Sequence, residues 1–109
     1  MRITHVLVIS IFILVLIGYG ERSEANDINA FVKACVSSTN LGERICECLA
    51  KKADERLTPN GFAFLVASMN KDEAKTEKLR SKLDMNEKLE AGMFMVNTPK
   101  ECAEELKGN

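Results

Sequence analysis

The chain has 109 residues, of which 46% are apolar, 28% charged and 6% aromatic, and its formal charge at pH 7 is −1. This length suffices for one ordinary domain but not for two. Proteins that bind nucleic acid need a clear excess of lysine and arginine to contact the phosphates, so the balanced charge argues against that class of partner.

The first 25 residues differ from the rest of the chain. Arg2 gives a short positive start, and residues 6–17 are apolar with a single exception. Ser23 and Ala25 then supply small residues at the positions typical of a cleavage site. Because the apolar run is shorter than the roughly 20 residues of a membrane-spanning helix, we predict a secretory signal peptide over residues 1–25. An uncleaved segment would instead be the chain's one contact with a membrane.

Cleavage would leave residues 26–109 as a single domain, located in the periplasm or outside the cell. His5 and Tyr19 both belong to the leader, so the mature chain would contain no histidine, tyrosine or tryptophan. Such a chain lacks the general base of Ser-His and Cys-His catalysis and a common ligand of zinc and copper. We therefore expect no enzymatic activity and no cofactor.

The remaining sequence predicts helices. No stretch alternates apolar and polar residues as a half-buried strand does, and turn or cap residues recur at regular intervals. Helices are expected over residues 27–37, 40–57, 58–70 and 71–83, then from Asp84 and from Thr98 to the end. The predicted fold class is therefore all-α, a small disulfide-stabilised bundle of five or six short helices.

Two of these helix starts carry specific signals. Thr58 precedes Pro59, which suits a hydroxyl cap followed by proline at the first helical position. Thr98, Pro99 and Glu101 form the same arrangement with a capping-box carboxylate, and they predict a separate last helix. In the helix before it, one apolar stripe is expected to face the core: Met85, Leu89, Met93 and Val96.

Four cysteines remain after export, and an even number in a short exported chain favours structural disulfides. The preferred pairs are Cys35 with Cys46, which lie almost symmetrically about the turn near Asn40, and Cys48 with Cys102. Cys46 and Cys48 project about 200° apart on a helix, so each would face a different partner. The alternative of Cys35 with Cys48 and Cys46 with Cys102 stays open, since Cys48 continues the apolar stripe of its helix.

Residues 61–67 and 91–96 are more apolar than a helix with one buried face requires. We expect these helices to be central and buried on more than one side. The functional alternative is an apolar groove around Phe64, Phe94 and Met95, which lie off the main stripes and would bind a lipid or a hydrophobic peptide.

The composition and patterns together predict a small exported binding protein whose partner is another protein. A carrier of a small apolar ligand in the Phe/Met-lined groove is one alternative. A second is a thiol- or copper-handling factor that uses Cys46 and Cys48, with Met93 and Met95 as thioether ligands.

Overall fold

The structure is a computed structural model, and it describes residues 26–108. Five helices account for the regular secondary structure in this range: α2 (Ile28–Ser38), α3 (Glu43–Arg56), α4 (Pro59–Met69), α5 (Glu73–Lys82) and α6 (Met85–Lys107). The predicted all-α class with disulfides is thus confirmed. The predicted signal peptide, residues 1–25, lies outside the described residues. None of the described helices is both long and apolar enough to cross a membrane.

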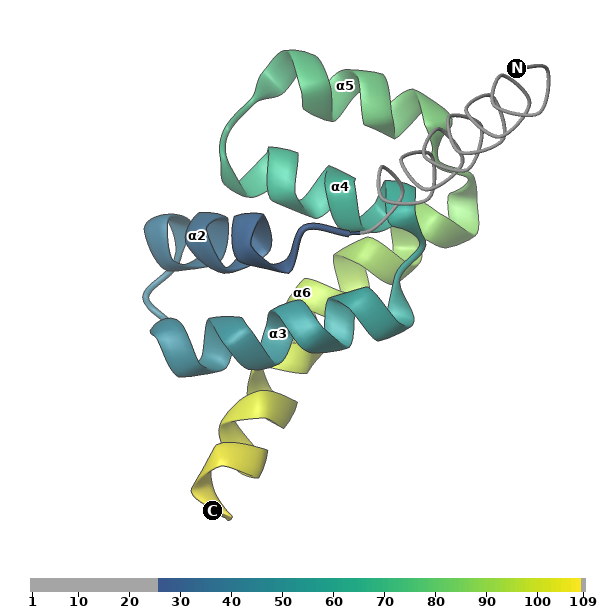
Figure 1. Ribbon diagram of the computed structural model, residues 1–109. Helices are drawn as coiled ribbons and strands as arrows, with labels where there is room; N and C mark the ends of the chain where they lie inside the picture. Colours follow the sequence, from purple (N-terminus) through teal and green to yellow (C-terminus); the bar gives the residue numbers. More distant parts are fainter. Residues whose placement is uncertain (1–25, 109) are drawn as a thin grey trace, which may run out of the picture.

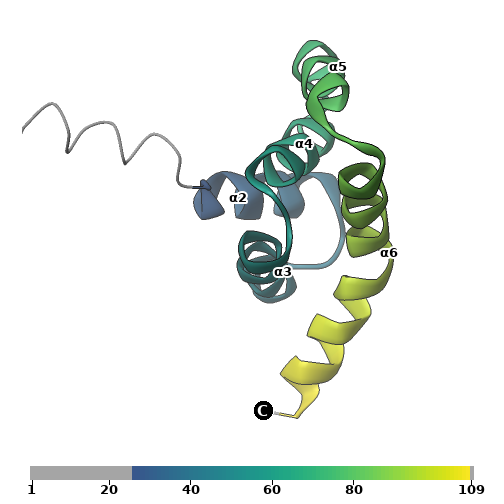
Figure 2. The same ribbon diagram turned by 90° about the vertical axis from the view of Figure 1, so that its right-hand side faces the viewer.

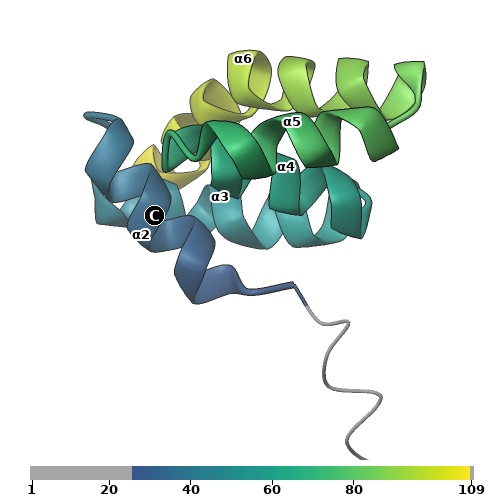
Figure 3. The ribbon, with the colours of Figure 1, turned by 90° about the horizontal axis from the view of Figure 1, so that it is seen from above.

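The helices form two antiparallel hairpins and a long closing helix (Figure 1). α2 pairs with α3, α4 pairs with α5, and α6 packs across α3 and α4. Seen from above, α5 lies over α4, and α6 runs alongside α4 (Figure 3). Figure 2 shows that the described helices lie on one side of α6 and leave its other side open.

The core lies where α2, α3, α4 and α6 meet. Phe31 and Leu49 are fully buried, and the ring of Phe31 lies 5.3 Å from that of Phe62, measured between centroids. α6 contributes Ala91 and Phe94 to the same cluster. Four of the five helices therefore share one apolar core, whereas α5 packs on α4 through little more than Leu79.

Three of the predicted helix starts are confirmed by the hydrogen bonds at their caps. The Asp27 carboxylate accepts from the amide of Ala30, and the Thr58 hydroxyl accepts from Gly61 ahead of Pro59. Asp84 forms a complete capping box in which its side chain and that of Glu87 each accept a backbone amide. These signals are local, and each satisfies amides that the first turn of a helix leaves without a partner.

The predicted cap at Asn40 is wrong. α3 begins at Glu43, and its N-cap is Gly42, which has a φ of 88° and no side chain to cap with. Thr39 occupies the turn instead, since its hydroxyl donates to the carbonyl of Cys35 and accepts from the amide of Leu41. The turn requires a positive φ at position 42, a conformation that glycine adopts without strain.

The predicted break at Thr98 is also wrong, because α6 continues through Pro99 to Lys107. Proline inside a helix removes one backbone hydrogen bond and bends the axis. Figure 2 shows α6 changing direction between its first and last turns. The carboxylate of Glu101, expected to cap the helix start, is instead bound to side chains of α3. Contacts with α3 therefore override the local stop signal.

The continuity of α6 decides which of its sides is buried. Cys102 is fully buried against α3, and steps of three or four residues back from it reach Thr98, Phe94 and Ala91, which are all buried. The stripe expected to face the core therefore points the other way: Met85, Leu89, Met93 and Val96 are exposed.

This orientation predicts opposite stability effects for adjacent residues of α6. Phe94→Ala should lower the free energy of unfolding by about 3–5 kcal/mol, because it empties a core position. Met93→Ala, at a side chain 55% exposed, should change it by less than about 1 kcal/mol. Urea unfolding of the two variants measures both effects, and a larger loss for Met93→Ala would contradict this packing of α6.

Candidate binding surface

The most exposed large apolar side chains of the described residues lie in one row on α6. Their exposed fractions are 69% for Met85, 58% for Leu89, 55% for Met93 and 73% for Val96. The spacing of four, four and three residues places them on one face, opposite the face that packs on α3 and α4. We call these four residues the outward stripe. Scattered exposed apolar residues are ordinary, but a row along one helix face is typical of an interaction site.

Gly92 makes a notch in the outward stripe. A Cβ atom built at this glycine would have no atom within 4 Å, so the fold of the chain does not require a glycine there. Leu89, Gly92, Met93 and Val96 have the i, i+3, i+4, i+7 spacing of a hole that receives one side chain of a facing helix. The absence of a side chain at Gly92 deepens this hole. The geometry therefore suits a partner helix with an apolar side chain at the contact.

The apolar groove around Phe64, Phe94 and Met95 stays a prediction, and the structure shows how far each of these side chains is buried. Phe94 is 5% exposed and belongs to the core, while Phe64 and Met95 are partly buried and pack against that core. The guanidinium of Arg80 lies over the Phe64 ring, 5.8 Å from its centroid. A groove that used all three side chains would therefore have to open the core. The other expectation was that the helices of residues 61–67 and 91–96 are buried on more than one side. The burial of the first segment agrees with it, whereas Met93 and Val96 leave one side of the second exposed.

The sequence alone does not reveal the outward stripe, because the local signal at Thr98 divides α6 into two separate helices. With a break at Thr98, the inward position of Cys102 places no constraint on residues 85–96. The larger apolar side chains then define the inward face. The position of Cys102 does predict the correct face if the helix is assumed to continue through Pro99. Steps of three or four residues back from Cys102 then reach Phe94 and Ala91, which are both buried.

Two disulfides join helices of the described chain, and one of them holds α6, which carries this surface. Cys35 and Cys46 join α2 to α3 with a Cα–Cα distance of 5.7 Å, and Cys48 and Cys102 join α3 to α6 at 6.0 Å. These are the pairs that the helical-hairpin geometry favours, and Cys46 and Cys48 do face different partners. By the chain-entropy argument the shorter loop contributes about 3 kcal/mol and the longer about 4 kcal/mol.

All cysteines among the described residues are in these two disulfides. A thiol- or copper-handling site would need reduced Cys46 and Cys48. The described residues also contain no cluster of three or more potential histidine, cysteine or carboxylate metal ligands. The bonds agree with an oxidising environment, which is where such disulfides persist.

Ion pairs surround the disulfide between α3 and α6. The ammonium of Lys52 lies 3.2 Å from Glu101 and 2.9 Å from Glu105, and Arg56 donates two hydrogen bonds to Glu101. The hydrogen bonds from Arg56, followed by that from Lys52, lower the pKa of the Glu101 carboxyl to about 2. The pKa of Lys52 is raised, mainly by its hydrogen bonds to Glu105 and Glu101. This network holds the last turns of α6 against α3.

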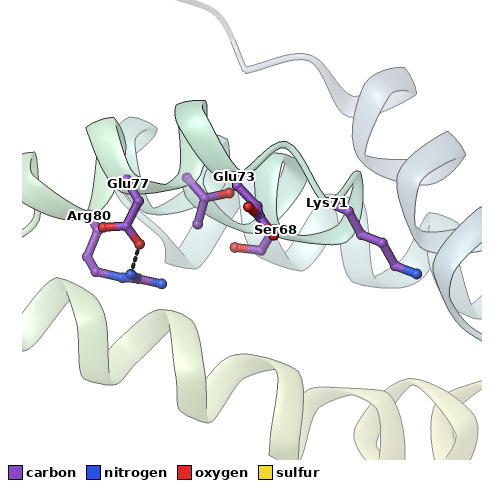
Figure 4. A pocket seen from close by; sticks show the side chains of 6 residues that line it. Ser68, Lys71, Glu73, Glu77 and Arg80 are labelled. Atoms are coloured by element: carbon purple, nitrogen blue, oxygen red, sulfur yellow. Dashed lines mark hydrogen bonds and ion pairs between the residues drawn. The ribbon is translucent and has the colours of Figure 1, made fainter.

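A shallow polar hollow of about 520 Å³ lies between α4 and α5 (Figure 4). It is lined by Ser68, Lys71, Glu73, Thr76, Glu77 and Arg80. Glu77 and Arg80 point toward one another and form an ion pair, so their charges neutralise each other. Lys71 lies at the other end of the hollow (Figure 4). Mixed charges in an open, solvated hollow indicate an ordinary helix surface.

The lowered pKa of Glu101 predicts an acid-sensitive contact. Its folded-state pKa lies below the ordinary 4.5, so the carboxylate stabilises the fold above pH 4.5, and this stabilisation is lost as the pH falls toward 2. Glu101→Gln should therefore lower the urea midpoint at pH 7 and flatten its decrease between pH 5 and about pH 2. Glu104→Gln, at an exposed position of the same helix, is the control. Equal pH profiles for Glu101→Gln and the unsubstituted protein would contradict the assignment.

The two disulfides should differ in their ease of reduction. Cys35 and Cys46 are both fully buried, whereas Cys48 is partly exposed and open to attack by an external thiolate. Under limiting reductant and native conditions, alkylation should appear first at Cys48 and Cys102. Peptide mass mapping measures the order, and earlier labelling of Cys35 and Cys46 would show this reasoning to be wrong.

Comparison of the chain with protein-family models, with curated proteins and with solved structures finds no match. The surface of the chain itself therefore carries the argument for function.

Proposed function

We propose that this chain is a small exported protein that acts by binding another protein through the outward stripe of α6, without catalysis. The observation that carries the proposal is the exposure of Met85, Leu89, Met93 and Val96 on the face of α6 opposite the core. When a partner removes a row of large apolar side chains from water, the free energy of the system falls, which favours the complex.

Flexible methionines and the notch at Gly92 support an amphipathic helix as the part of the partner that docks. Two helices pack on one another through side chains at three- and four-residue spacing, which is the spacing of the outward stripe. Methionine side chains adapt their shape to the partner at such surfaces. The polar hollow at Ser68 and Glu77 offers no comparable apolar area.

Export is the second part of the proposal. It rests on the layout of residues 1–25 and on the two disulfides, which are rare in reducing compartments. The release of the mature chain into the periplasm or the extracellular space would bring the outward stripe to its partner there.

The experiment is site-specific crosslinking in the cells that make the protein. A photoreactive amino acid in place of Met93 should give adducts, whereas the same residue in place of exposed Lys78 on α5 should give few. The double variant Leu89→Glu/Val96→Glu should abolish the adducts from position 93 and leave the thermal midpoint nearly unchanged, because both side chains are exposed.

The matched control is Ala74→Glu/Ser81→Glu, which adds the same charges to exposed positions of α5. It should leave the crosslinks from position 93 intact. Crosslinks that persist in the α6 double variant, or that form equally from position 78, would refute binding through the outward stripe.

A further inference from the structure

The apolar side of α6 that faces away from the core follows a coiled-coil spacing. Met85, Leu89, Gly92 and Val96 are separated by four, three and four residues, and partly buried Pro99 and Ala103 continue the series. Alternating steps of three and four residues are the pattern of a seam that packs against another helix. Both the spacing and the apolar composition of this face are therefore those of a helix–helix interface.

We propose that a second copy of this chain covers the outward stripe, and that the two α6 helices pack antiparallel with Gly92 of each copy against Val96 of the other. This inference rests on the proposed function, since it names the partner that the outward stripe binds. The two-fold symmetry makes both halves of the contact identical.

The side-chain sizes favour the antiparallel arrangement. In this register Val96 of each copy enters the hole that Gly92 leaves open in the other, and Met85 lies against Ala103. Large residues thus meet small ones at both positions. A parallel pair would place Gly92 against Gly92 and leave a void at the centre of the contact, which costs stability.

The charges beside the outward stripe agree with the same register. Lys100 borders the stripe, Glu90 lies farther round α6 on the same side, and both are exposed. In an antiparallel pair the same side of α6 in each copy faces its counterpart. Glu90 of one copy then lies within two residues, or about 3 Å along the axis, of Lys100 in the other. Lys88 lies on the opposite edge, and its two copies are far apart. The pairing therefore brings opposite charges together.

The size of the outward stripe sets the expected strength of the pairing. Its four side chains on one helix expose less area than the roughly 800 Å² that each partner buries in a stable complex. The dimer should therefore be weak and dependent on concentration, with a dissociation constant in the micromolar range or above.

Sedimentation of the purified, oxidised protein from about 10 µM to about 1 mM tests the pairing. We expect the weight-average mass to rise from that of one chain toward that of two. A protein that remains monomeric at the highest concentration would overturn the inference.

Gly92→Leu is the decisive variant, because it affects the monomer and the dimer differently. The open space at position 92 accommodates the new side chain, and replacing a mid-helix glycine favours the helix, so the thermal midpoint of the monomer should not fall. Filling the hole that Val96 enters should weaken the dimer about 10-fold or more. An unchanged or stronger dimer would overturn the antiparallel register.

Charge exchange gives an independent check. Glu90→Lys and Lys100→Glu should each weaken the dimer, and the double variant should recover most of the loss, since the opposite charges are restored in reversed positions. Losses that simply add in the double variant would contradict the predicted contact between positions 90 and 100.

The outcomes also separate this inference from the proposed function. A monomeric protein whose position 93 still crosslinks to a different protein would overturn the second copy as the partner and leave the proposed function standing. A monomeric protein without stripe-dependent crosslinks would overturn both.

Discussion

The bond between Cys48 and Cys102 is the constraint on which the arrangement of α6 depends. It joins positions 54 residues apart and places a buried sulfur of α6 against α3. A helix is rigid about its own axis, so one fixed position determines the direction of every other side chain. Phe94 then faces the core and Met93 faces water. The ion pairs of Lys52 and Arg56 with Glu101 act at the same junction.

The sequence predicts those parts of the fold that depend on interactions between residues close together in the chain. The caps at Asp27, Thr58 and Asp84 were predictable because each links a side chain to an amide within three residues. Asn40 and Thr98 carry similar local signals, but the helix starts predicted from them are wrong. At Asn40, the hydroxyl of Thr39 and the positive φ of Gly42 determine the turn. At Thr98, contacts with α3 keep the helix continuous, and these contacts lie about 50 residues away in the chain.

The candidate surface depends on that long-range information more than the fold does. The composition of residues 85–96 shows that α6 has more apolar side chains than one face can bury, but either face satisfies the helical period. The longer row of large apolar side chains, from Met85 to Val96, lies on the exposed face. Packing volume in a small core limits what can enter it, and α6 contributes Ala91, Phe94 and Cys102 to the core cluster, with no leucine among them.

The outward stripe and Gly92 are difficult to explain by the stability of a single chain. Four exposed apolar side chains contribute little to folding, and glycine in the middle of a helix costs about 0.5–1 kcal/mol relative to alanine. A domain this small has a narrow stability margin, and two disulfides compensate for its limited core. No contact in the described chain requires a glycine at position 92. The proposed facing helix would supply the missing reason, because the same notch that weakens α6 alone would allow close approach of a second helix.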